Sequence, residues 1–411
     1  MTTRWILFFA LILPVWQLWK RLPLLFELSA YFGSGFLVLL LSFGTARFLS
    51  SRLFRKLVDG DGKAVLVTGC DTGFGNLLAK RLSRSGFLVY AGCLNASSED
   101  ACELAKECNV QVLQLDVTKE EEMDNAVMAV KNTLGTKSKL NTAYTNCTSN
   151  GNLIDCLHEK NLFREMTLRT KQLTSLFFFF LAGAELWAVV ANAGVPSHGL
   201  LEWASMSSIR KIFDVNVFGV VSVSKKFLPL LRKSKGRLVI TGSVLGRSTV
   251  PTGVVYCMTK HAVISLADGL RRECGDKGVY VSTVEPTAYR TRILSDVGSM
   301  EKTRQQLSLL PRESLEDFTE QEVSDWMKAA STIADLTRRD DVNEVVDQMV
   351  LAVREKEPKP NYAAWGLWEP VFYLVCREAP AELIDFLLVA FRKATRAGLL
   401  DGTWRLSRIW T

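Results

Sequence analysis

The stretch KAVLVTGCDTGFG, from Lys63 to Gly75, decides the fold of this chain. Its apolar and β-branched residues at 64–68 are typical of a strand that is buried on both faces of a sheet. A glycine-rich turn follows, and after it come a helical pattern and a second apolar run, at Asn76–Ser85 and Phe87–Ala91. The order strand, turn, helix, strand predicts a βαβ unit.

Gly69, Gly73 and Gly75 occupy the turn between the first strand and the helix. Glycines let the backbone turn tightly and bring N–H groups close to a pyrophosphate at the N-terminus of a helix. Because the motif lies after a buried strand and before a helix, it indicates a dinucleotide site more strongly than three glycines alone would. A tight turn without a ligand is the alternative.

The alternation of strands and helices continues along the chain. Further strands are expected at Val110–Leu115, Leu186–Val190, Arg237–Thr241 and Tyr280–Val284, and helices at Lys119–Thr133, Ser207–Leu231 and Val254–Cys274. This alternation predicts an α/β fold with a single doubly wound, Rossmann-like parallel sheet. Ligands of such sheets bind beyond the carboxyl ends of the strands. The residues that the sequence places there are Gly69, Asp116, Asn192, Ser243 and Pro286.

Tyr256 and Lys260 are four residues apart, so they share one face of the expected helix. A free tyrosine has a pKa of about 10, but a nearby ammonium and a cationic nicotinamide favour the phenolate. Tyr256 can then take the proton of an alcohol while hydride leaves for the cofactor. Ser243, which precedes the tyrosine in the sequence, can hydrogen-bond the reacting oxygen. Lys260 can also hold the nicotinamide ribose, and Asn216 can anchor a water beside it.

Together with Asn192-Ala-Gly194 and Pro286-x-x-x-x-Thr291, these motifs resemble those of the short-chain dehydrogenase/reductase family. The resemblance covers residues 63 to about 358, apart from one stretch. KAVLVTG and FLPLLRKSKGRLV (Phe227–Val239) resemble more closely the membrane-bound branch of the family. That branch includes 17β- and 11β-hydroxysteroid dehydrogenases type 2, retinol dehydrogenases and D-3-hydroxybutyrate dehydrogenase.

The resemblance implies NAD(P)-dependent interconversion of a hydroxyl and a carbonyl group, with Tyr256 as the acid/base. Its catalytic residues are then Asn216, Ser243, Tyr256 and Lys260. Its cofactor-binding residues are then Gly69, Thr72, Gly73, Gly75, Asp116, Val117, Asn192, Tyr256, Lys260 and Thr291. In the family pattern Asp116 and Val117 meet the adenine, Asn192 ends the central strand, and Thr291 lies near the nicotinamide.

Two positions depart from the family pattern. The usual pair of asparagines before Ala-Gly is Ala191-Asn192 here, a change expected to affect stability more than chemistry. The usual Pro-Gly is Pro286-Thr287, which is expected to stiffen the loop over the nicotinamide.

The choice of cofactor depends on the end of the second strand. An acidic residue there binds the ribose 2′-hydroxyl and favours NAD, whereas an arginine favours NADP. The chain reads Gly92-Cys93-Leu94-Asn95, which has neither. The missing cation and the named relatives favour NAD, with NADP the less favoured alternative.

The N-terminus is strongly hydrophobic. Two apolar runs, Trp5–Trp19 and about Leu28–Ala46, are near the minimum length of a spanning helix. They predict a retained membrane anchor over residues 1–56, with a signal peptide or a buried hairpin as alternatives. Four cations follow the second run, at Arg47, Arg52, Arg55 and Lys56, so the catalytic domain is expected on the cytosolic side. We expect the endoplasmic reticulum, with the mitochondrial inner membrane as the alternative.

Composition excludes several classes of protein. The formal net charge of +7 is small for 411 residues, so no nucleic-acid partner is expected. The nine cysteines are irregularly spaced without a C-x-x-C motif, which favours free thiols in a reducing compartment. Because the three histidines are scattered, no metal site is expected.

One stretch, residues 135–184, is too long for the fold. Asp116 and Asn192 are 76 residues apart, where one helix and one strand need about 30. The excess is polar at first and ends in Phe177–Phe180. It is interpreted either as a retained intron or as a loop that contacts a membrane or a partner, and sequencing the transcript distinguishes the two.

The domain that follows the anchor is assigned to residues 63–358, and its specificity is expected between about Thr287 and Trp326. Residues 359–411 form an aromatic segment that either packs on the core or lies at a membrane interface. We expect a small hydrophobic alcohol or ketone, steroid- or retinoid-like, as substrate, contact with membrane lipid, and leave a homo-oligomer open. The alternatives are D-3-hydroxybutyrate oxidation, for which no cation is singled out, and a non-catalytic membrane scaffold.

Overall fold

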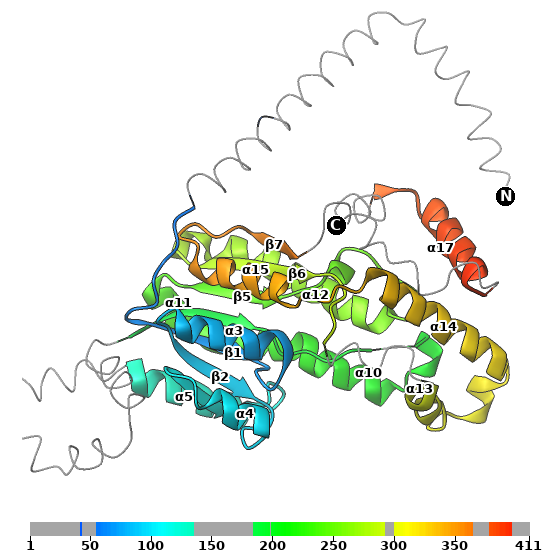
Figure 1. Ribbon diagram of the computed structural model, residues 1–411, viewed down its shortest axis with the longest axis horizontal. Coiled ribbons are helices and arrows are strands. Elements are labelled where there is room, and N and C mark those ends of the chain that lie inside the picture. Colours follow the sequence, from blue (N-terminus) through cyan, green and yellow to red (C-terminus); the bar gives the residue numbers. More distant parts are fainter. Residues whose placement is uncertain are drawn as a thin grey trace, which may run out of the picture. The chain divides into compact units, whose positions relative to one another are not determined.

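Seven parallel strands form one sheet in the order β3-β2-β1-β4-β5-β6-β7 in the computed structural model (Figure 1). The structure describes residues 42, 55–134, 184–197, 199–291, 300–364 and 378–396. The strands are β1 Lys63–Thr68, β2 Leu88–Cys93, β3 Val110–Gln114, β4 Glu185–Ala191, β5 Arg237–Thr241, β6 Tyr280–Pro286 and β7 Asn361–Ala364. The first six have the doubly wound order with a crossover between β1 and β4, so the predicted Rossmann-like sheet is confirmed.

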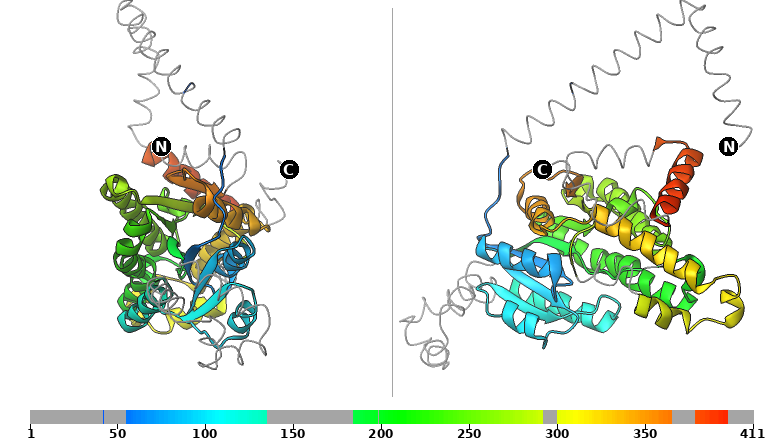
Figure 2. Two further views of the ribbon diagram at one scale, coloured as in Figure 1. Left: turned by 90° about the vertical axis from the view of Figure 1, so that its left-hand side faces the viewer. Right: turned by 45° about the vertical axis from the view of Figure 1, so that its right-hand side comes forward.

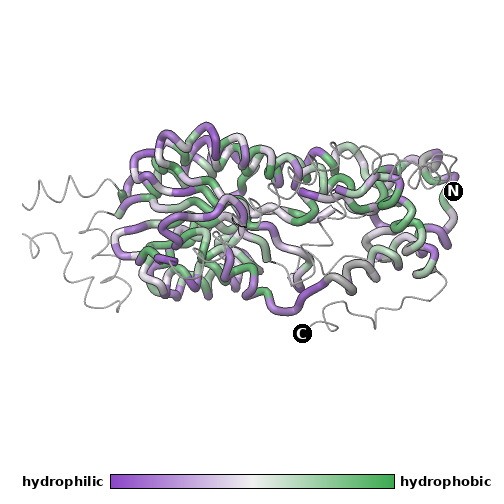
Figure 3. The backbone as a smooth tube through the Cα atoms, turned by 90° about the horizontal axis from the view of Figure 1, so that it is seen from above, coloured by the Kyte–Doolittle hydropathy of each residue, from purple (hydrophilic) through white to green (hydrophobic). Residues whose placement is uncertain are grey.

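Helices cover both faces of this sheet (Figure 2). One face packs against α3 Gly73–Arg84, α4 Glu99–Leu104 and α15 Asn343–Arg354. The other packs against α5 Glu120–Leu134, α11 Val220–Ser234 and α12 Val254–Cys274. Because both faces are covered, the strands are nearly continuous apolar runs, which lie in the hydrophobic interior in Figure 3.

The helix predicted over residues 207–231 is present, and it contains a π-helical turn. It consists of α10 Met206–Phe213, the π-helical turn Asp214–Gly219 and α11, which follow one another directly. Ser205 caps α10 by accepting a hydrogen bond from the backbone N–H of Ser208. The prediction of a largely helical segment is therefore confirmed, and the π-helical turn adds one residue to its helical register.

Strand β7 and helices α4, α13 (Met300–Leu307) and α15 were not predicted from the sequence. The N-cap of α4 is Ser98, whose side chain accepts from the backbone N–H of Ala101. Strand β7 pairs with β6 in the register Thr283↔Asn361 to Pro286↔Ala364. Its sequence NYAA has little strand character, so pairing with β6 determines its conformation.

A separate apolar cluster lies among α13 Met300–Leu307, α14 Glu320–Thr337 and the loop after β4. Its buried members include Trp203, which contacts Phe318 edge-on at 5.7 Å between ring centroids. In this region a short 3-10 turn, Arg312–Leu315, is followed by α14, which begins with a capping box between Thr319 and Glu322. The last described helix is α17, Ala381–Arg396.

Several predicted segments lie outside the described residues. They are nearly all of the N-terminal anchor (1–56), residues 135–183 of the long insertion, and residues 365–377 and 397–411 of the C-terminal segment. Among the helices of the described part, none has the length and apolar character needed to cross a bilayer.

Candidate active site

The carboxyl ends of β1, β4, β5 and β6 lie at one edge of the sheet, since all these strands are parallel. The structure brings Gly69, Asn192, Ser243 and Pro286 to this edge, as the sequence analysis expected. Helix α12 adds Tyr256 and Lys260, and the π-helical turn adds Asn216.

The glycine-rich loop after β1 has no room for a side chain at Gly69 or Gly75. Gly69 and Gly73 have φ angles of +70° and +64°, a conformation that favours glycine. A Cβ at Gly75 would lie 2.2 Å from the carbonyl oxygen of Gly69. Thr72 is the N-cap of α3, so the N-terminus of this 12-residue helix faces the loop. These features fit the pyrophosphate of a nicotinamide dinucleotide, which Gly69, Thr72, Gly73 and Gly75 would hold.

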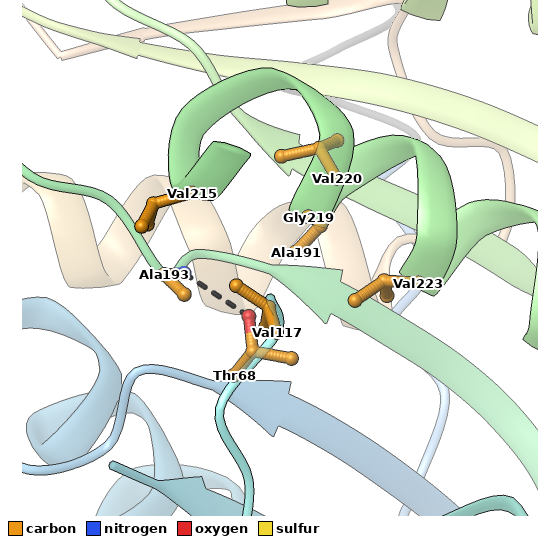
Figure 4. Close-up of a pocket in the computed structure, with 8 residues that line it drawn as sticks. All are labelled: Thr68, Val117, Ala191, Ala193, Val215, Gly219, Val220 and Val223. Carbon is orange, nitrogen blue, oxygen red and sulfur yellow. Dashed lines mark hydrogen bonds between the residues drawn. The ribbon is translucent and has the colours of Figure 1, made fainter. Parts of the chain in front are cut away.

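Asn192 ties this loop to the centre of the sheet. Its Nδ2 donates to the carbonyl oxygens of Thr68 (3.0 Å) and Gly69 (3.2 Å). Its Oδ1 accepts from the hydroxyl of Thr241 at 3.3 Å. The Thr68 hydroxyl in turn accepts from the backbone N–H groups of Asn192 and Ala193, both at 3.0 Å. Figure 4 shows the bond with Ala193 as a dashed line. The single asparagine therefore joins the ends of β1, β4 and β5.

Lys260 is buried and lies beneath the tyrosine. Its ammonium donates to the carbonyl oxygen of Thr241 at 2.9 Å and lies 5.5 Å from the centroid of the Tyr256 ring. Burial lowers the pKa of Lys260 to about 8. At neutral pH most of the side chain still carries its charge.

Tyr256 is partly exposed, and Ser243 lies beside it. Burial raises the pKa of Tyr256 to about 12, while a hydrogen bond with Ser243 acts in the opposite direction. The Ser243 hydroxyl accepts from the backbone N–H of Leu245 at 3.1 Å and donates to the carbonyl oxygen of Pro286 at 3.4 Å. The second bond is long, so the hydroxyl can exchange it for a substrate oxygen.

Asn216 is buried and connects the loop after β4 to α12. Its Oδ1 accepts from the backbone N–H of Val195 at 2.8 Å, and its Nδ2 donates to Val195 O (2.9 Å) and Thr259 Oγ1 (3.2 Å). A Cβ at Gly194 would lie 3.4 Å from Asn216 Oδ1 and 3.9 Å from Lys260 Nζ. The loop therefore closely approaches both side chains, and Asn216 itself lies in the π-helical turn.

Asp116 and Val117 lie at the end of β3. The Asp116 carboxylate accepts from Thr118 N–H (2.9 Å) and hydroxyl (2.7 Å), and Glu122 accepts from the Asp116 N–H at 2.6 Å. Val117 lines a small apolar pocket with Ala193 and neighbouring residues (Figure 4). The pocket has no space for a water molecule, so Val117 packs here against the protein.

Thr291 lies beside the glycine-rich loop. Its Cγ2 would be 3.9 Å from a Cβ at Gly73, and its hydroxyl donates to the carbonyl oxygen of Tyr289 at 3.4 Å. Tyr289 is buried, donates to Glu344 at 2.8 Å and packs edge-on against Phe74 of the loop. The segment after β6 is thus held against the glycine-rich loop.

Sequence reasoning missed Asp71, which lies inside the glycine-rich loop. Its carboxylate accepts hydrogen bonds from the backbone N–H groups of Leu94 and Asn95, just after β2. An acidic residue within such a loop was the available signal. Among the residues of the chain, the predicted cofactor preference depended only on those at the end of β2 itself.

Comparison with known proteins identifies the class. A family model described as short chain dehydrogenase matches residues 63–166 and 178–302. Retinol dehydrogenase 7 of Mus musculus is 31% identical over 331 residues, which cover 79% of this chain and 87% of that protein. The mitochondrial D-beta-hydroxybutyrate dehydrogenase of Rattus norvegicus is 36% identical over 229 residues, 55% of this chain and 54% of that protein.

A solved structure shares the fold. A short chain dehydrogenase/reductase from Burkholderia phymatum, in complex with NAD, covers 78% of this chain and 93% of its own, with a TM-score of 0.52 and 18% identity. The chain belongs to the short-chain dehydrogenase family, so the predicted family is confirmed. It is an NAD(P)-dependent oxidoreductase that acts on CH–OH groups.

Proposed function

We propose that this enzyme interconverts a hydroxyl and a carbonyl group on a hydrophobic, retinoid- or steroid-like substrate, with Tyr256 as the acid/base. The observation that carries the proposal is the arrangement of Tyr256 beside Ser243 and above the buried ammonium of Lys260. Retinol dehydrogenase 7, which this chain resembles over most of its length, supports the retinoid class.

The residues divide the chemistry among them. When bound, the nicotinamide supplies the acceptor for hydride. Tyr256 takes the proton of the substrate hydroxyl on its phenolate oxygen, and in reduction it returns that proton. Lys260 stabilises the phenolate electrostatically, which is needed because burial raises the pKa of Tyr256 to about 12. Ser243 holds the substrate oxygen, and Asn216 fixes the loop that carries Gly194 beside Lys260.

Arg247 disfavours the alternative substrate, D-3-hydroxybutyrate. It follows Ser243 by four residues, so it is a cation that could hold a small carboxylate substrate. However, its guanidinium pairs with both carboxylate oxygens of buried Glu285, at 2.9 and 3.2 Å. This bidentate ion pair neutralises the charge of the Arg247 guanidinium, which is then not available to a substrate carboxylate. The apolar cluster around Trp203 and α14 is also more compatible with a hydrophobic substrate.

We propose NAD as the cofactor rather than NADP. The stretch Gly92–Asn95 at the end of β2 contains no cation for a 2′-phosphate. The proposed ligands of the dinucleotide are Gly69, Thr72, Gly73, Gly75, Asp116, Val117, Asn192, Tyr256, Lys260 and Thr291.

We also propose that the enzyme is anchored in the endoplasmic reticulum membrane by residues 1–56, with its catalytic domain in the cytosol. The two apolar runs and the cations after them support this placement. Helix α17 adds exposed Phe386, Leu387 and Val389, which suit contact with lipid. The mitochondrial inner membrane is the second candidate location, and association into a homo-oligomer stays a prediction.

The test uses the full-length chain in detergent and measures NADH formation with a panel of steroids, retinol and D-3-hydroxybutyrate. Tyr256→Phe should lower kcat by about 10²-fold or more while leaving NADH binding intact, because it removes only the phenolic oxygen. Tyr280→Phe is the control, since Tyr280 is an exposed tyrosine at the start of β6.

Three outcomes would contradict parts of the proposal. Unchanged activity of Tyr256→Phe would refute the acid/base role. Activity of the wild type on hydroxybutyrate alone would replace the hydrophobic substrate. A wild type that binds NADH but acts on no member of the panel would favour a non-catalytic membrane scaffold.

A further inference from the structure

Asp71 bridges two loops at the edge of the sheet. Its Oδ2 accepts from the backbone N–H of Leu94 at 2.9 Å, and its Oδ1 accepts from that of Asn95 at 3.0 Å. Each carboxylate oxygen of Asp71 therefore accepts one hydrogen bond, and the two donors are the backbone N–H groups of consecutive residues. A carboxylate has about four acceptor positions, so each oxygen can still accept a further hydrogen bond.

The sheet places this carboxylate at the end of β2. Strands β1 and β2 are paired in the register Thr68↔Gly92, so the loops that follow them leave the same edge together. The backbone N–H of Cys70 also donates to the carbonyl oxygen of Gly92 at 2.9 Å. In doubly wound sheets, this edge next to the glycine-rich turn is where the adenosine ribose of a dinucleotide is held.

Within the described part of the chain, Asp71 forms no ion pair. The stretch Gly92–Ser98 contains no lysine or arginine. The thiols of Cys70 and Cys93 are buried, and their pKa values are raised mainly by burial and further by the negative charges around them, including Asp71. The two cysteines therefore stay neutral and leave a single negative charge at this corner.

We propose that Asp71 determines the cofactor specificity of the enzyme, accepting a hydrogen bond from a ribose 2′-hydroxyl and repelling a 2′-phosphate. The inference rests on the proposed function, because it assumes that the edge binds a nicotinamide dinucleotide. Asp71 takes the place of the acidic residue that usually ends the second strand. The charge comes instead from the loop that holds the pyrophosphate.

A purely structural role is the competing explanation, in which Asp71 only fastens the turn after β2. The two roles differ in their response to charge. Asp71→Asn keeps the size of the side chain but removes its charge, so it should tighten NADPH binding relative to NADH by about tenfold or more. In Asp71→Asn/Asn95→Asp the charge returns on the β2 side, and the preference for NADH should return with it.

The measurement is a fluorescence titration of NADH and NADPH against the full-length chain in detergent, without substrate. Asp276→Asn, an exposed aspartate in the turn after α12, is the matched control and should leave the ratio of the two Kd values unchanged. If Asp71→Asn does not fold, Asn95→Lys offsets the charge while keeping both backbone hydrogen bonds, and it must shift the ratio in the same direction.

The outcomes separate the two proposals. A wild type that binds NADH more tightly than NADPH, with a ratio that follows the charge at positions 71 and 95, supports the inference. A wild type that binds NADH but whose ratio ignores these charges overturns the role of Asp71 and leaves the proposed function intact. A wild type that binds neither dinucleotide overturns both.

Discussion

Replacing Lys260 by methionine should make the protein more stable and nearly inactive. Lys260 is only 6% exposed, and burial lowers its pKa from 10.5 to about 8. At 1.36 kcal/mol per pKa unit, this fall means that the charged side chain destabilises the folded state by about 3 kcal/mol. Methionine has a similar length and no charge, so it can fill the same space.

The expected gain for Lys260→Met at pH 7 is about 1 kcal/mol in the free energy of unfolding. This is the cost of about 3 kcal/mol less the lost hydrogen bond to the carbonyl oxygen of Thr241, which is worth about 1.5–3 kcal/mol when the donor is charged. Activity should fall by about 10²-fold or more, because the phenolate of Tyr256 loses its cation.

The effect must depend on pH in a defined direction. Below pH 8 the lysine is charged in the folded and unfolded states, and its full cost is present. Between pH 8 and 10.5 the unfolded chain holds a proton that the folded chain has released, so the stability of the wild type rises with pH. At pH 9.5 the cost of burying the lysine falls to less than half, so the advantage of the variant should largely disappear.

The assay is urea unfolding of the full-length chain in detergent, followed by tryptophan fluorescence at pH 7 and pH 9.5. Lys233→Met is the control, since Lys233 is an exposed lysine in the last turn of α11 and its replacement should change stability by less than about 0.5 kcal/mol. The reasoning fails if Lys260→Met is no more stable than the wild type at pH 7. It also fails if the advantage does not decline at pH 9.5.

Two further substitutions test the backbone strain at Thr252 and the close packing at Gly219. Thr252, just before α12, has a φ angle of +63°, which is strained for a β-branched residue, so Thr252→Gly should raise the unfolding free energy by about 0.5–1 kcal/mol. Thr252→Val retains the strain, and an equal gain in that variant would contradict the explanation. Gly219→Ala should cost about 1–3 kcal/mol, because its Cβ would lie 2.6 Å from Val117 Cγ2. The double variant with Val117→Ala should recover most of that loss in the same unfolding assay, and no recovery would show that the contact is not the cause.

Most of the six longer strands could be predicted because they are buried apolar runs between turn signals, whereas β3 reads VQVLQ and is only partly buried. Strand β7 could not, since NYAA acquires its conformation from pairing with β6 more than 70 residues earlier. The π-helical turn also left no signal, because one inserted residue hardly alters the apolar periodicity around Asn216. The predicted site residues were brought together by strand order, whereas these features depend on tertiary contacts.

Asp71 illustrates the same limit within the site. The search for an acidic residue followed the end of β2, where Gly92–Asn95 offers none. The carboxylate reaches that position from a residue 23 positions earlier than Leu94, through the pairing of β1 with β2. Proximity in the sequence identifies the edge of the sheet, but it does not identify which loop supplies the charge.

The two points at which the long insertion joins the fold have a consequence for how this chain can vary. Helix α5 begins beyond the carboxyl end of β3 and runs back, so its last residue, Leu134, and the first residue of β4, Glu185, both belong to the edge opposite the site. Segments added at that edge do not interrupt any of the loops that carry Gly69, Asn192 or Ser243. The length of the segment between α5 and β4 can therefore differ between variants of the protein without a change in the loops that carry the site residues.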